Sequence, residues 1–198
     1  MANAGIGKLR KAMLVYLVGF LVTVVGYFLG FAPLLAAGSS HSSLASTASL
    51  LIFVSVMIVG IIVTIVALLL IRSGFKMLAT TDSGYGIGAL GALLELIGLA
   101  FFFLAAVVAL VGLASLSSST SGFGALAAFA GTLLAMLGLF ALGALLAFIG
   151  VVLILVAFWR VGSKNNSSLI KIGAIFYLLF GLIGVLLLYI GLGELEKK

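Results

Sequence analysis

Glu95 is the residue in this sequence whose type and position point most clearly to chemistry. It lies in an apolar run, from about residue 87 to 114, that holds no other ionisable side chain. Ionisable residues inside a membrane helix are costly, and they usually mark an ion or proton pathway or a polar contact between helices. Gly91 lies about 40° from Glu95 around a helix, so we expect the carboxyl group to face another helix. Two interpretations stay open: a proton or cation site, and a polar clamp between helices.

The remaining polar residues do not form a catalytic set. Cysteine is absent, His41 is the only histidine, and Asp82 is the only aspartate. Neither a G-x-S-x-G nucleophile motif nor an H-E-x-x-H zinc motif occurs. Gly86, Gly88 and Gly91 match G-x-G-x-x-G, but no strand precedes them, as a dinucleotide site requires. The sequence therefore predicts no enzyme, no metal centre, no cofactor and no nucleic-acid partner.

The composition excludes an ordinary soluble globular protein. Of the 198 residues, 65% are apolar and only 7% are charged, and the mean hydropathy is +1.52. Soluble domains carry about 25% charged residues. We therefore expect an all-α, integral membrane helical bundle that forms one transmembrane domain over residues 1–198, in a multi-pass protein of the cell membrane.

Uncharged stretches set the number of membrane crossings, because a spanning helix needs about 20 apolar residues. Five apolar stretches meet this requirement, at approximately 12–37, 50–71, 87–114, 130–159 and 169–192; Glu95 in the third and Lys171 in the fifth are their only charged residues. The fourth belongs to a longer uncharged run, 123–159, which would measure about 55 Å as one helix. This run either tilts, projects beyond the membrane or breaks, and a break into two crossings would give six spans.

The basic residues favour five spans over six. With five, eight of the ten Lys and Arg residues fall on one side, which the positive-inside rule assigns to the cytoplasm. The N-terminus is then cytoplasmic, and the tail from Glu194 onward is outside. Five of these residues form a predicted basic belt that could meet anionic lipid head groups: Arg72, Lys76, Arg160, Lys164 and Lys171.

Glycines are spaced so that helices can pack closely. Small residues on one face allow helices to associate in a membrane, where apolar side chains alone give no preference. The predicted packing residues fall in three of the five spans: Gly26 and Gly30, Gly91 and Gly98, and Gly181 and Gly184. Similar residues around Arg72 and Arg160 also suggest a parallel repeat of the second and third spans by the fourth and fifth.

Several segments together resemble a known family. They are Arg72–Lys76, Gly91–Gly98, Trp159–Gly162, Asn165–Ile175 and Leu188–Gly193. In these segments the chain resembles a family of archaeal polytopic membrane proteins known only as a domain of unknown function. The resemblance runs from Arg72 to the C-terminus. It implies an archaeal cell membrane, and it assigns no catalytic residues.

Three functions are compatible with the sequence. The first is a structural or accessory membrane protein, self-associating or a small subunit of a larger membrane complex, with membrane lipids around it. The second is a transporter or channel for a small solute or protons that uses Glu95. The third is a lipid- or envelope-interacting protein that uses the basic belt. The short loops favour the first, because they leave little room for a soluble active site.

Overall fold

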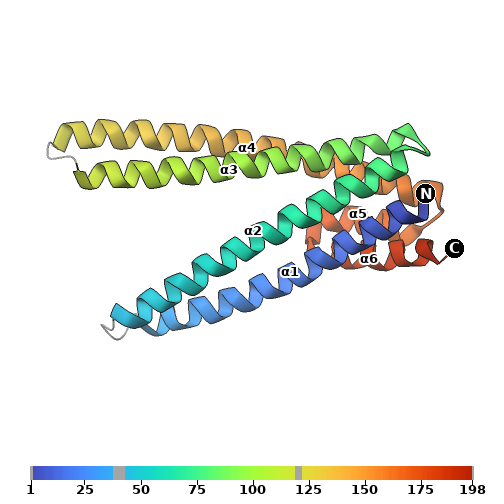
Figure 1. Ribbon diagram of the computed structural model, residues 1–198, viewed down its shortest axis with the longest axis horizontal. Coiled ribbons are helices and arrows are strands. Elements are labelled where there is room, and N and C mark those ends of the chain that lie inside the picture. Colours follow the sequence, from blue (N-terminus) through green and yellow to red (C-terminus); the bar gives the residue numbers. More distant parts are fainter. Residues whose placement is uncertain (1, 38–42, 119–121, 198) are drawn as a thin grey trace. The chain divides into compact units, whose positions relative to one another are not determined.

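A computed structural model describes residues 2–37, 43–118 and 122–197 of the chain. In these residues every regular element is helical, which confirms the all-α class (Figure 1). The elements are α1 (Ala2–Ala37), α2 (Ser43–Ala79), a 3-10 turn η1 (Ser83–Tyr85), α3 (Gly86–Ser118), α4 (Gly122–Lys164), α5 (Ser168–Phe180) and α6 (Leu182–Glu196). Gly30 and His41 lie outside the residues whose surroundings the structure describes.

Four of the helices, α1 to α4, are long and apolar enough to cross a membrane, as expected for a helical membrane bundle. A helix suits such a sequence because it satisfies its backbone hydrogen bonds internally, where lipid offers no partner. Helix α4 settles the question left open for residues 123–159: it is a single helix of 43 residues. The alternative of a break into two crossings is therefore wrong.

The predicted fifth span, 169–192, is also wrong as one continuous helix. The chain reverses at Gly181, where φ is +34°, a value that favours glycine. Helix α5 has 13 residues and α6 has 15, so each is only about 20 Å long, against a hydrocarbon core near 30 Å. The two helices form an antiparallel hairpin, and Gly184 lies directly against the backbone of Tyr177. Gly181 is thus the turn residue of this hairpin and contributes nothing to helix packing.

The chain divides into two compact units, which we describe separately. The first contains Met1–Ala89 and Leu155–Lys198, and the second contains Leu90–Ile154. The suggested parallel repeat does not extend into the helices that follow α2 and α4, because α3 has 33 residues and α5 has 13. The early reversal at Gly181 causes this difference.

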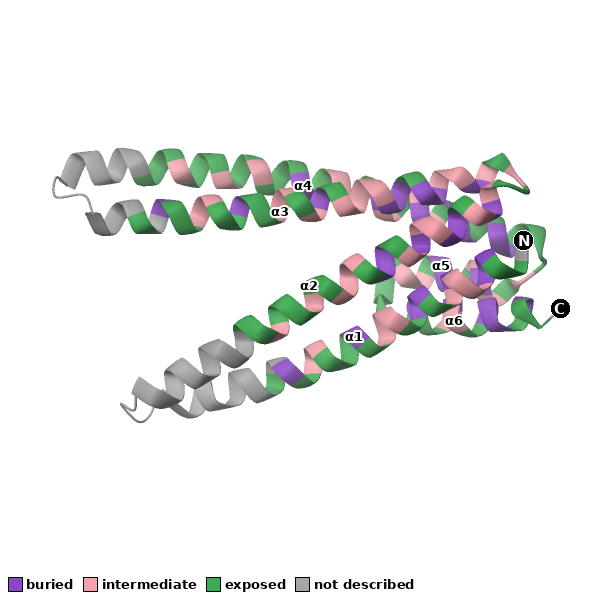
Figure 2. Ribbon diagram, viewed as in Figure 1, coloured by how far each residue is buried: buried purple, intermediate pink, exposed green. Residues whose placement is uncertain are grey.

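The first unit is built on the antiparallel pair of α1 and α2. Gly26 faces Val56, with only 2.8 Å between the position of a Cβ atom at Gly26 and Cγ1 of Val56. Near the other end of the pair, a Cβ atom at Gly74 would lie 3.0 Å from the carbonyl oxygen of Gly5. Helix α6 packs along α1. The largest fully buried side chains gather where these helices meet the end of α4 (Figure 2): Leu9, Met13, Leu68, Ile71, Phe75, Phe158, Val161, Ile170, Leu188 and Leu192.

Candidate functional site

The second unit places Glu95 at a crossing of two helix backbones. A Cβ atom at Gly91 of α3 would lie 2.6 Å from the carbonyl oxygen of Gly150 on α4. Two turns further along, a Cβ atom at Gly98 would lie 2.7 Å from the carbonyl oxygen of Gly143. Any side chain at these positions would overlap the opposite backbone. The two helices can approach this closely only because both contribute glycine.

Glu95 lies between these two glycine pairs, over Gly150. A Cβ atom at Gly150 would lie only 3.1 Å from Cβ of Glu95 and 2.8 Å from its backbone nitrogen. Oε2 of Glu95 is buried and accepts no hydrogen bond from the residues that the structure describes. A buried polar atom without a partner is costly, and more so in lipid.

The part of α4 that faces α3 offers Glu95 no side-chain donor. The α4 residues nearest to Gly91 and Gly98, on either side of Glu95, are Gly143, Ala147, Gly150, Leu153 and Ile154, which carry only apolar side chains or none. A polar clamp between α3 and α4 therefore does not form in this pair. Any donor to Oε2 of Glu95 therefore lies outside the described residues of this pair.

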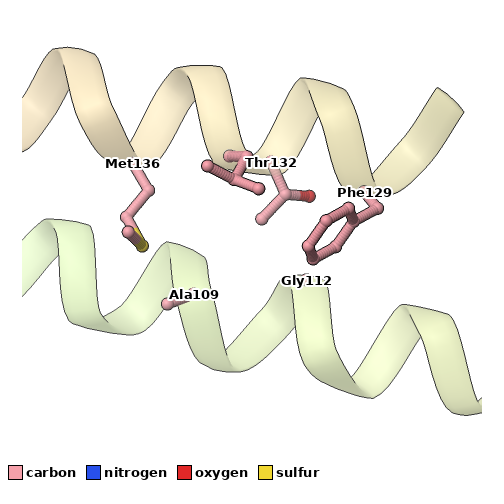
Figure 3. A pocket seen from close by; sticks show the side chains of 6 residues that line it. Ala109, Gly112, Phe129, Thr132 and Met136 are labelled. Carbon is pink, nitrogen blue, oxygen red and sulfur yellow. The ribbon is translucent and has the colours of Figure 1, made fainter. Parts of the chain in front are cut away.

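A hollow between α3 and α4 is apolar. Its volume is about 320 Å³, and Ala109 and Gly112 of α3 face Phe129, Thr132 and Met136 of α4 across it (Figure 3). Leu133 completes the lining, and Thr132 supplies the one polar side chain. Such a hollow suits hydrocarbon and gives a charged solute no binding groups.

The residues of the predicted basic belt lie in the first unit, and two of them contact the turn between α2 and α3. Arg160 donates a hydrogen bond of 2.9 Å to the carbonyl oxygen of Gly84. Lys164 pairs with Asp82 and lies over the ring of Tyr85, 5.5 Å from its centroid. These two side chains therefore hold the end of α4 against the turn. Fewer of the five belt charges are then available to bind lipid head groups.

The other three belt residues are placed differently. Lys76 is exposed and Lys171 is half-buried against Gly162. Arg72 is half-buried, and its Nε–H group donates to no acceptor among the described residues. Binding of anionic lipid by the belt stays a prediction. It would rest chiefly on these three side chains.

A further charged cluster, which the sequence did not predict, joins the two ends of the chain. Nη1 of Arg10 in α1 lies 2.8 Å from Oε2 of Glu196, the last residue of α6. The guanidinium group also lies over the ring of Tyr189, 4.9 Å from its centroid. The prediction that the C-terminal tail lies on the opposite side from the N-terminus is therefore wrong, because the tail packs beside α1.

Together these contacts define one end of the first unit, which we call the charged end. It contains Lys8, Arg10, Asp82, Arg160, Lys164 and Glu196. Lys8 is held there by a hydrogen bond of 2.7 Å to the hydroxyl group of Ser73. This end thus brings together the start of α1, the ends of α2 and α4, the start of α5 and the end of α6.

The Arg10–Glu196 pair gives a first testable prediction. Arg10→Glu should place two carboxylates together and lower the melting temperature of the purified protein, and adding Glu196→Arg should restore most of the loss. We expect a modest effect, because partly exposed ion pairs contribute little and salt screens them. Thermal unfolding of the two single variants and the double variant at low salt measures it. If the double variant loses as much melting temperature as the two single variants together, the two side chains do not interact.

Comparison with known proteins places the chain in a family. The family model described as "Protein of unknown function (DUF973)" matches residues 3–198. The chain belongs to this family. No curated protein and no solved structure matches it. The DUF973 match covers both units, including Glu95 and the whole α5/α6 hairpin, so these features lie within the family region.

Proposed function

We propose that this chain is a multi-pass protein of the cell membrane with a structural or accessory role, either self-associating or as a small subunit of a larger membrane complex. The observation that carries this proposal is the buried carboxyl oxygen of Glu95, which lacks a donor on the helix that packs against it. A neighbouring chain that donates a hydrogen bond to Glu95 would remove this cost.

The composition of the α3/α4 pair supports the same proposal. Among the described residues of the second unit, only Ala92, Ala105 and Ile154 are buried apolar side chains, whereas large residues such as Phe103 and Leu134 are exposed. The second unit therefore has almost no core of its own, and its surface suits packing against other membrane helices. The basic residues favour an orientation in which the charged end faces the cytoplasm.

The first test is the mass and composition of the particle that the protein forms in mild detergent. We expect a particle larger than the 20.3 kDa chain, made of several copies or of this chain with other membrane subunits. A monomer that persists across detergents and in lipid nanodiscs would contradict the proposal.

Glu95→Leu and Glu95→Gln form a matched pair of variants for the same proposal. Leucine removes the polar contact, whereas glutamine keeps hydrogen-bonding groups of similar size without a titratable proton. Since a hydrogen bond between membrane helices is worth about 1–2 kcal/mol in model peptides, Glu95→Leu should weaken assembly roughly 5- to 30-fold. Glu95→Gln should keep assembly near the original level, as measured by dilution in detergent.

Proton-linked transport is the second candidate, and the buried position of the Glu95 carboxyl group favours it. The two variants also distinguish the candidates. Proton-coupled flux into vesicles that is present in the original protein and lost in Glu95→Gln, with assembly unchanged, would support transport. Absence of flux in the original protein, together with dissociation of Glu95→Leu, would support the accessory role.

A further inference from the structure

The pair of helices α1 and α2 carries positive charge without any counter-charge of its own. Residues 2–79 contain five Lys and Arg residues and neither Asp nor Glu. Arg10 pairs with Glu196 of α6. The other four form no ion pair with the residues that the structure describes: Lys8, Lys11, Arg72 and Lys76. A surface that carries charge of one sign concentrates ions of the opposite sign.

Three of these cations meet around one hydroxyl group, that of Ser73. Nζ of Lys8 donates a hydrogen bond of 2.7 Å to it, which brings a charge of α1 onto α2. Arg72 directly precedes Ser73, and Lys76 lies one turn further on, about 40° from Arg72 around the helix. A helical side chain covers the turn before its own Cα atom, so Lys76 reaches back over Arg72 and Ser73. We call Lys8, Arg72, Ser73 and Lys76 the Ser73 cluster.

The Ser73 cluster has hydrogen-bond donors to spare. The Ser73 oxygen accepts from Lys8, but its own O–H group donates to no acceptor among the described residues. Arg72 and Lys76 make no hydrogen bond there either, and Arg72 is half-buried with a buried Nε atom, so its side chain is held in place. Lys and Arg side chains can only donate. An anion with several oxygens can accept from all of these groups, in charge-assisted hydrogen bonds of the strong kind.

The position of the cluster along the helices indicates which anion this is. No charged residue occurs between Lys11 and Arg72, so the apolar part of α1 begins just after Lys11 and that of α2 ends just before Arg72. From Arg72 to Lys76 a helix rises about 6 Å. The head-group layer of one leaflet is about 5–7 Å thick. The cluster therefore spans this layer, at the level where lipid phosphate groups lie.

The rest of the predicted basic belt does not take part in this site. Arg160 and Lys164 are engaged with the turn between α2 and α3, through Gly84 and Asp82. Lys171 lies on α5, against Gly162 of α4. The charge available to an anion is therefore concentrated on the α1/α2 pair, where Lys8, which the belt did not include, adds to it.

We propose that the Ser73 cluster binds the phosphate group of an anionic phospholipid in the cytoplasmic leaflet. The side chains of Arg72 and Lys76 and the O–H group of Ser73 donate to the phosphate oxygens, and Lys8 adds its charge from α1. A head group with a cation of its own, such as choline, would lie against these lysines and bind more weakly. This inference rests on the proposed membrane placement but needs no partner subunit.

Native mass spectrometry tests this site, because it counts the lipids that each chain retains. The purified protein in mild detergent is mixed with equal amounts of phosphatidylglycerol and phosphatidylcholine. We expect one phosphatidylglycerol molecule per chain to be retained in preference to phosphatidylcholine. Since a basic residue near a membrane surface is worth about 1 kcal/mol toward anionic lipid, Lys76→Gln should lower the affinity about fivefold. Combined with Arg72→Gln, the loss should reach about 25-fold.

Lys197→Gln is the matched control. Lys76 and Lys197 are both exposed lysines, and each substitution removes one positive charge. Lys197 follows Glu196 at the charged end, outside the Ser73 cluster, so its loss should leave the affinity unchanged. Equal losses in the two variants would overturn a localised site in favour of diffuse attraction by net charge. Lys76 has no polar partner among the described residues, so Lys76→Gln should fold normally and melt at the original temperature without lipid.

Excess inorganic phosphate in the same experiment separates a lipid from a free anion. Phosphatidylglycerol that stays bound would support a lipid site, whereas complete displacement would show that the cluster takes free phosphate and would overturn the lipid assignment. Equal retention of the two lipids by the original protein would also overturn it. Either result leaves the accessory role intact. A chain that stays in solution without detergent would overturn the membrane placement, and the proposed function with it.

Discussion

Replacing Gly184 with alanine is expected to open the α5/α6 hairpin. A Cβ atom at this position would lie 2.6 Å from the backbone carbonyl carbon of Phe176, and closer still to the backbone nitrogen and Cα of Tyr177. Backbone atoms cannot move aside as the end of a flexible side chain can. Since alanine is otherwise the better helix former, the sign of the effect comes from packing alone. We expect a loss of about 3 kcal/mol or more.

Thermal unfolding in detergent measures this loss. For a chain of this size, about 3 kcal/mol corresponds to a fall in melting temperature of about 6–12 °C. Limited proteolysis should also cut Gly184→Ala within α5 and α6 under conditions where the original protein resists. Gly138→Ala is the matched control, because no atom lies within 4 Å of a Cβ atom there. This control should be neutral or more stable by up to about 1 kcal/mol; equal losses in both variants would contradict the hairpin packing.

The long helices could be predicted from the sequence because their cause is local. An uncharged run of 20 or more apolar residues has to form a helix in lipid, whatever its neighbours are. The predicted ends were less accurate. Helix α2 continues past Arg72 to Ala79, and α1 begins at Ala2, well before its first charge at Lys8. A helix does not have to end where a charged residue leaves the membrane.

The hairpin could not be predicted in this way. The stretch from Leu169 to Leu192 contains 24 residues, of which only Lys171 is charged, and this is the right length for one crossing. Glycine is common in membrane helices, so Gly181 alone does not indicate a turn. The reversal depends on Gly173 and Gly184, which let α5 and α6 touch, and on the position of Arg10, which holds the end of α6. These are contacts between distant segments, and no local pattern contains them.

The spacing of the glycines predicts which helix faces pack closely, but not which residues those faces pack against. Gly91 lies against Gly150, whereas Gly26 lies against Val56, a branched side chain. Gly131 and Gly138 form an apparent packing face on α4, yet both meet open space. The position of Glu95 toward a neighbouring helix was predicted, but the absence of a donor on α4 depends on which side chains oppose it. Which side chains oppose Glu95 follows only from the way α3 and α4 pair in the structure.

Cysteines introduced at Lys8 and at Lys197 are expected to react with a membrane-impermeant thiol reagent from the same side of a sealed vesicle. Residue 8 lies at the charged end, and residue 197 follows Glu196, whose carboxylate lies 2.8 Å from Arg10. A continuous fifth span would instead put the two positions on opposite sides, so the result is all or nothing. The chain has no native cysteine, so each label reports one position.

Ser163→Cys and Ser40→Cys serve as references for the two sides in the same experiment. Ser163 is exposed at the charged end. Ser40 lies between the first two predicted spans, and a cytoplasmic N-terminus predicts this loop on the outer side. Labelling of Lys197→Cys together with Ser163→Cys would establish that the hairpin enters and leaves the membrane on one side. Labelling together with Ser40→Cys would mean that α5 and α6 form one span of about 36 Å. In that case the contact of Gly184 with Tyr177 would not exist, and Gly184→Ala would behave like Gly138→Ala.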